Sequence, residues 1–148
     1  MLTLPVLPYK TISCSLAALL LGCTANNNTN LLAVPFSQGQ ALSEVDIRAI
    51  EVTASASARK ASNPAAFLGQ LWPGYHSQQQ LIHSYKLNSG TKATIIFDGI
   101  QDDSVRAYRF DIDLNKTSDN MWQLQDIIES WRCWDDRGHQ DFSIKPCA

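Results

Sequence analysis

The sequence predicts an α+β domain in which helices near its start pack on a curled antiparallel sheet. Helix-capping patterns open two segments before residue 74, whereas apolar and polar residues alternate most clearly over residues 108–114. Helices followed by a run of strands are typical of α+β proteins rather than of the alternating α/β class. The length of 148 residues fits a single domain once a leader is removed.

The helical part is predicted to begin at Ser43, where a capping hydroxyl is followed three residues later by Asp46. One long helix is expected over residues 43–61. Its buried stripe is expected to comprise Leu42, Val45, Ala49, Val52 and Ala56. The Asn63-Pro64 pair then predicts a short second helix, which Pro73-Gly74 ends.

About four strands are predicted after the helices, over residues 81–87, 92–100 and 108–114 and from Trp122 onward. The clearest alternation places Tyr108, Phe110, Ile112 and Leu114 on one face, between charged residues of the other face. The alternation slips near residues 126–128, which predicts a β-bulge. Ile127 and Trp131 are expected to take over the buried face beyond it.

The first 22 residues have the pattern of an export signal. Lys10 is their only charged side chain, and the apolar run after it is too short to span a membrane. The run ends in Leu20-Leu21-Gly22-Cys23, which resembles the lipobox of bacterial lipoproteins. The resemblance implies cleavage before Cys23 and acylation of its thiol with lipid such as palmitate. A buried helix that ends in Gly-Cys and an ordinary secretory signal are the alternatives.

The residue after this cysteine, Thr24, bears on the location of the mature protein. The absence of Asp at this position resembles sorting to the outer membrane, so a lipoprotein that faces the periplasm is expected. Residues 24–40 are uncharged and rich in Asn. We therefore expect a signal peptide over 1–22, a lipidated Cys23 with a flexible tether over 23–40, and one domain over 41–148. The alternative is an extended arm docked on the domain through Leu31, Leu32, Val34 and Phe36.

An exported chain of this kind keeps two further cysteines, Cys133 and Cys147, which are expected to form a disulfide. Closing a loop of 15 residues stabilises a protein by about 3 kcal/mol on the chain-entropy model. Two free thiols are the alternative. A pair of cysteines alone makes a poor zinc site, because zinc takes four ligands, so no metal or other cofactor is predicted.

The loop between these cysteines, residues 134–146, has three interpretations. It is structural if Arg132 and Arg137 pair with acids while Trp134 and Phe142 cover the edge of the core. It is a binding surface if its aromatic and basic residues contact a partner, in which case the candidates are Trp131, Trp134, Arg137 and His139. It is a metal or acid–base site if four side chains converge: Asp135, Asp136, His139 and Asp141.

Charge and motifs exclude some function classes. The formal net charge is −2, and no basic run is longer than Arg59-Lys60, which argues against nucleic acid as a partner. The chain contains no nucleophile elbow, phosphate loop or dinucleotide fingerprint. His76 and His83 have no evident partner in sequence. No catalytic residue is therefore assigned.

The expected function is that of a non-enzymatic module, held on the membrane by the lipid of Cys23, which binds an envelope protein or a cell-wall component. This interpretation predicts an exposed apolar patch that includes Trp134 or Trp72. The order of elements is similar to cystatin-like and NTF2-like folds, which implies the alternative of a small-ligand binder with a pocket of about 300 Å³ or more. A hydrolase or metal site around His139 is the third hypothesis.

Overall fold

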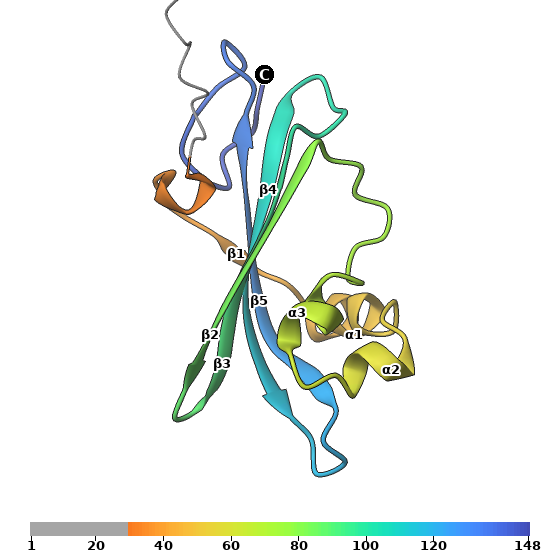
Figure 1. The fold of residues 1–148 in the computed structure, drawn as a ribbon. Helices are drawn as coiled ribbons and strands as arrows, with labels where there is room; N and C mark the ends of the chain where they lie inside the picture. Colours follow the sequence, from red (N-terminus) through yellow and green to blue (C-terminus); the bar gives the residue numbers. More distant parts are fainter. Residues whose placement is uncertain (1–29) are drawn as a thin grey trace, which may run out of the picture.

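The computed structural model describes residues 30–148, so the leader and Cys23 lie outside the described residues. The described chain forms an antiparallel sheet of five strands in the order β1-β5-β4-β3-β2, with short helices against it (Figure 1). Its elements are η1 (Leu31–Ala33), β1 (Gln40–Ala41), α1 (Glu44–Glu51), α2 (Ala56–Arg59), α3 (Pro64–Leu68), β2 (Gln79–Leu87), β3 (Gly90–Asp98), β4 (Val105–Lys116) and β5 (Trp122–Cys133). The predicted α+β class is confirmed.

The two longest strands, β4 and β5, confirm the predicted alternation. Phe110, Ile112 and Leu114 of β4 are buried on the face that the helices cover. On β5 the register moves from Asp113↔Asp126 to Leu114↔Leu124, so Gln125 is the extra residue of a β-bulge. Beyond the bulge Ile127 is fully buried, as predicted, whereas Trp131 is only partly buried.

The single long helix predicted over residues 43–61 is wrong. Ser43 caps α1 as expected, since its side chain accepts a hydrogen bond from the amide of Asp46. The helix nevertheless ends at Glu51, and Ser55 caps the separate helix α2. Serine and threonine oxygens bond nearby backbone groups in place of the helical pattern, which explains the break between the two helices.

The predicted buried stripe of this helix is also wrong. Val45 and Val52 are 78% and 73% exposed, and α1 instead buries Ile47 and Glu51. The carboxylate of Glu51 accepts a hydrogen bond from the backbone amide of Leu124, next to the bulge, at 2.9 Å. A buried carboxylate needs such a partner. This contact therefore sets which face of α1 meets β5.

A fifth strand, β1, corrects the predicted number of four. Gln40 and Ala41 pair with Glu129 and Ile128 at the edge of the sheet formed by β5. A two-residue strand carries no period-2 signal of its own, so only the pairing in three dimensions reveals it.

Residues 30–40 are not the flexible tether that the sequence predicts. Leu31 and Val34 are buried in a second apolar cluster, with Ile96, Ala107 and Phe142, on the face of the sheet opposite the helices. The docked-arm alternative describes these two residues correctly, while Leu32 and Phe36 remain exposed. The arm covers an apolar part of this face, so its burial gains free energy that outweighs the ordering of a polar segment.

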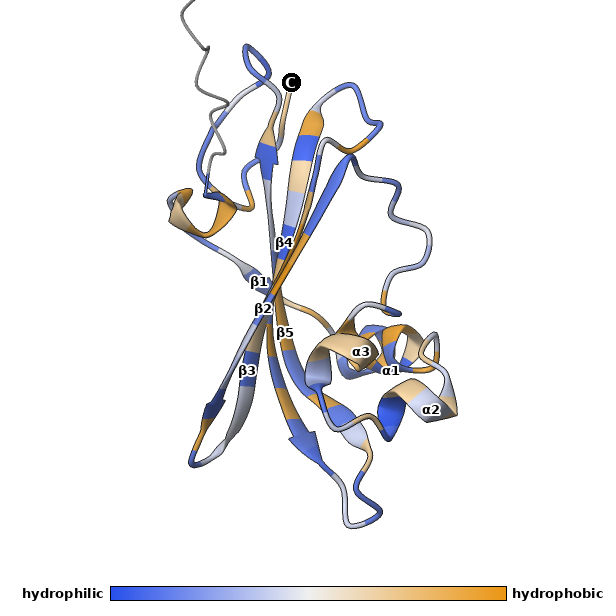
Figure 2. Cartoon of the chain, viewed as in Figure 1, coloured by the Kyte–Doolittle hydropathy of each residue, from blue (hydrophilic) through white to orange (hydrophobic). Residues whose placement is uncertain are grey.

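The sheet therefore has a layer on each face. The main core lies between the sheet and the helices, and the second cluster lies beneath the arm and the C-terminal segment. Figure 2 shows hydrophobic residues gathered along the middle of the strands and on η1, and hydrophilic residues on the C-terminal loop and at the turn between β4 and β5. No helix between residues 30 and 148 is long and apolar enough to cross a membrane.

Candidate functional site

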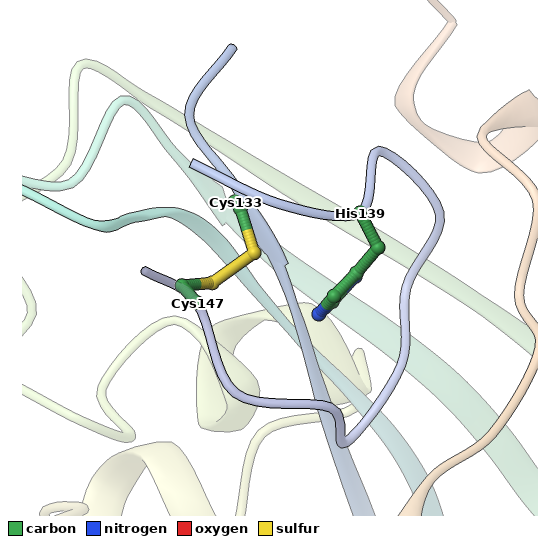
Figure 3. A group of neighbouring side chains, drawn as sticks. All are labelled: Cys133, His139 and Cys147. Atoms are coloured by element: carbon green, nitrogen blue, oxygen red, sulfur yellow. A yellow bond between two sulfur atoms is a disulfide. The ribbon is translucent and has the colours of Figure 1, made fainter. Parts of the chain in front are cut away.

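The C-terminal loop is closed by the predicted disulfide between Cys133 and Cys147, whose Cα atoms lie 5.6 Å apart (Figure 3). The loop turns tightly at Asp136 and Gly138, which both have positive φ angles. A Cβ atom on Gly138 would lie 2.8 Å from the sulfur of Cys133. The backbone must therefore pass against the disulfide at a position that only glycine fits.

The tryptophans of the sequence hypothesis do not form an exposed patch. Trp134 is half-buried, because its indole N–H donates to the carbonyl of Asp102 at 2.8 Å and the guanidinium of Arg106 lies 5.4 Å from its ring. Trp72 is 9% exposed and stacks on Phe110 with ring centroids 4.1 Å apart. Among residues 30–148 the exposed large apolar side chains are instead Leu32, Phe36, Val45, Val52, Tyr85 and Leu87.

The other candidate binding residues of the loop also maintain its structure. Trp131 donates its indole N–H to the carbonyl of Lys145 at 2.9 Å and exchanges two backbone hydrogen bonds with Ser143. The carbonyl of Arg137 accepts from the amide of Ala148 at 2.7 Å, and its side chain is exposed. These contacts fit the structural interpretation of the loop.

The acid–base interpretation required four side chains to converge, and the structure brings only two of them together, since Nδ1 of His139 lies 3.7 Å from Oδ1 of Asp141. Asp135 and Asp136 are exposed, and Asp135 approaches only Arg106, at 3.9 Å. The ring nitrogens of His139 face the backbone carbonyls of Asp141 and Lys145, each at 2.8 Å.

The expected pairing of Arg132 with an acid is present. Its guanidinium donates to the carboxylate of Asp98 at 2.6 Å, and Arg106 reaches the same oxygen at 3.3 Å. Arg132 and Asp98 are both buried, so this cluster joins the end of β3 to the end of β5. It is a structural ion pair rather than part of a site.

A groove of about 740 Å³ lies at the other end of the sheet. It lies where the β2–β3 hairpin approaches the start of α3, beside the first residue of β5, Trp122. Its lining consists of Ser62, Pro64, Ser84, Tyr85, Lys86, Leu87, Asn88, Ser89, Gly90, Thr91, Asn115, Lys116 and Trp122. We call this hollow the hairpin groove.

The hairpin groove has a distinct chemistry. Hydroxyl and amide side chains make up much of its lining, which includes two lysines and no carboxylate. The ammonium group of Lys116 lies 4.8 Å from the ring of Trp122, and the indole N–H of Trp122 donates to the carbonyl of Ala61 at 2.9 Å. Tyr85 and Leu87 supply exposed apolar surface. Such a lining suits a ligand that is rich in hydroxyl groups and carries negative charge.

Sequence reasoning missed this groove. Asn88-Ser89-Gly90 predicts a turn, and the turn is present between β2 and β3. The polar residues that it contributes meet Ser62 and Lys116 only because the chain brings distant segments together. The absence of acidic residues over 84–92 is the one local signal that was available.

A smaller hollow of about 330 Å³ lies at the opposite end of the same face, beside Tyr75, Tyr108 and His76. Burial, followed by the charge of Glu129, raises the pKa of Tyr75 to about 12. The pKa of Asp102 is lowered because its carboxylate accepts hydrogen bonds from two backbone amides. Tyr75 is therefore a neutral hydroxyl at physiological pH. The carboxylate of Asp102 is already bound by the backbone amides of its own turn.

The chain matches no protein-family model, and no curated protein or solved structure is significantly similar to it. The arguments about its function therefore rest on the residues described above.

Proposed function

We propose that this protein is a non-enzymatic lipoprotein of the bacterial outer membrane, held by lipid on Cys23, which binds anionic, hydroxyl-rich glycans of the cell wall in the hairpin groove. The observation that carries the ligand class is the lining of the groove, with its hydroxyl and amide groups, two lysines and no acid. Carboxylates of a cell-wall fragment would pair with Lys86 and Lys116, and its hydroxyls would bond the serine and asparagine side chains.

The position of the arm supports this arrangement. The arm and the C-terminal loop lie at one end of the sheet, and the β2–β3 hairpin lies at the other (Figure 1). Because the arm is docked from Leu31 onward, only residues 24–29 separate Cys23 from Asn30, a span of at most about 25 Å. A lipid on Cys23 would hold the arm end near the membrane and turn the groove toward the cell wall.

Anchoring is tested on the full chain expressed in a Gram-negative host with an alkyne analogue of palmitate. The wild-type chain is expected to incorporate the label and to fractionate with outer membranes. Cys23→Ser is expected to lose the label and to leave the membrane fraction, whereas Cys14→Ser is the matched control and is expected to keep both. Equal labelling of all three chains, or an unlabelled wild type, contradicts the anchor.

Ligand binding is tested with purified muropeptides, in which a disaccharide carries carboxylates. The double variant Lys86→Glu/Lys116→Glu is expected to weaken binding at least tenfold, which corresponds to about 1.4 kcal/mol for the lost charged contacts. Lys60→Glu is the control, since Lys60 is exposed and lies outside the groove. Binding that is absent from the wild type, or that the control weakens equally, contradicts the groove as the site.

A further inference from the structure

The imidazole of His139 lies beside the disulfide, and its Nδ1 is also 3.7 Å from a carboxylate oxygen of Asp141. One ring nitrogen and the two sulfur atoms of Cys133 and Cys147 all lie within 4.8 Å of one another. Figure 3 shows the three side chains converging from the end of β5, the loop and the C-terminal segment. The imidazole is well shielded, with its side chain 10% exposed.

Hydrogen bonds hold this arrangement independently of the sulfur–sulfur bond. The backbone amide of Cys133 donates to the carbonyl of His139 at 3.0 Å. The side-chain amide of Gln140 lies within hydrogen-bond distance of the carbonyls of Cys133, Trp134 and Gly138. The backbone pair between Trp131 and Ser143 closes the base of the loop. The loop should therefore keep its shape when the disulfide is reduced.

We propose that the reduced protein binds a zinc ion through Cys133, His139 and Cys147. A dithiol reductant supplies two electrons and two protons: the bond between the two sulfurs breaks, two thiols form, and the dithiol becomes a disulfide. Zinc then replaces the two thiol protons, which leave to solvent, and binds two thiolates and one imidazole nitrogen. Two cysteines and one histidine are a known zinc ligand set, and a water molecule completes four-coordination.

The geometry accommodates this change. In a tetrahedral site with Zn–S bonds of about 2.3 Å, two thiolates lie about 3.8 Å apart. Rotation of the two side chains achieves this separation from Cα atoms 5.6 Å apart. Each ring nitrogen of His139 now faces a backbone carbonyl at 2.8 Å, so the nitrogen that binds zinc would give up its contact while the other keeps the carbonyl of Asp141 or of Lys145. Such a contact orients metal-binding histidines in proteins.

The disulfide and the zinc site exclude each other, since both use the same sulfur atoms. The protein would thus have a disulfide in an oxidising compartment and a zinc site under reducing conditions. This inference does not depend on the hairpin groove or on its ligand.

The test uses the full chain with Cys14→Ser and Cys23→Ser, so that Cys133 and Cys147 are its only thiols. A trialkylphosphine reduces the disulfide, with water, to two thiols and a phosphine oxide, and Co²⁺ is then added without oxygen. One cobalt ion per chain is expected, with near-ultraviolet thiolate charge-transfer bands and the intense visible bands of tetrahedral cobalt. Added Zn²⁺ is expected to abolish these bands.

His139→Ala is expected to lower the affinity for cobalt at least about tenfold. The matched control His83→Ala, at an exposed position on β2, is expected to leave it unchanged. If His139→Ala does not fold, His139→Asn retains a polar side chain for the carbonyl contacts and serves in its place. The proposal is overturned if the reduced chain binds no stoichiometric cobalt, if the oxidised chain gives the same spectrum, or if the two histidine variants bind equally.

Discussion

Asp98, at the end of β3, pairs with two arginines, Arg106 of β4 and Arg132 of β5. One of its oxygens accepts from Arg132 and from Arg106, and both Asp98 and Arg132 are buried. Removing one partner of a buried pair leaves the other charge without compensation, which costs far more than the pair itself contributes.

Asp98→Asn is therefore expected to lower the free energy of unfolding by about 3 kcal/mol. The control is Asp113→Asn, which breaks a pair with Lys92 in which both side chains are 47% exposed. This control is expected to change stability little, because solvent screens the pair. Urea unfolding measures both variants, and equal losses would contradict a special role for the buried cluster.

Gly138 is the second residue whose role is specific to its position. Its φ of 144° is unfavourable for other residues, and an added Cβ would meet the sulfur of Cys133 at 2.8 Å. Gly138→Ala is expected to destabilise the protein by about 1 to 3 kcal/mol. Gly74→Ala is the matched control, because a Cβ there meets no atom within 4 Å. If thermal unfolding ranks the two variants equally, the close approach of backbone and disulfide is not a constraint.

At the scale of the elements, the docking of the arm, residues 30–40, is the largest difference from the domain that the sequence predicts. Leu31 is 5% exposed and packs in the second cluster, whereas its neighbour Leu32 is 36% exposed. The contrast within one dipeptide provides an internal control for the docking of the arm.

Leu31→Ala is expected to cost about 2 kcal/mol, since it removes buried methyl groups from a packed cluster. Leu32→Ala is expected to stay within about 0.5 kcal/mol of the wild type. Chemical denaturation of the full chain measures the difference. A result in which both variants match the wild type would mean that the arm does not contribute to stability.

The helices separate features that depend on neighbouring residues from features that depend on the rest of the fold. The cap at Ser43 and the Asn63-Pro64 start of α3 are both present as predicted, because a cap depends on residues within one turn. The buried face of α1 was predicted wrongly, because it depends on the pairing of Glu51 with a backbone amide of β5. Hydrophobic patterns count only apolar residues as buried, so they do not mark Glu51.

At the scale of the whole molecule, the disulfide helps to hold the C-terminal loop and the arm on the sheet. It returns the C-terminus to the end of β5, and Phe142 within the closed loop packs on Leu31 and Val34 of the arm. The C-terminal loop and the arm therefore stabilise each other on the face opposite the helices. Loss of the disulfide should lower the free energy of unfolding of the domain without changing the hydrogen-bonded path of the loop.

The oxidised full chain is expected to be more stable than Cys147→Ser by about 3 kcal/mol, from the entropy of a loop of 15 residues. This difference corresponds to a melting temperature lower by about 10 °C or more for a domain of this size. The comparison is made with a chelator present, so that a metal does not restore the link. Coincident melting curves would show that the disulfide contributes nothing to stability.

The sequence by itself determined the α+β class, the alternation of β4, the bulge of β5 and the pair Cys133–Cys147. These features follow from local periodicity, local capping chemistry or the count of cysteines. Only the tertiary structure decided the docking of the arm, the short strand β1, the face of α1, the hairpin groove and the place of His139 beside the disulfide. Each of these depends on contacts between segments far apart in the chain, and a pattern read along one segment carries no information about its distant neighbour.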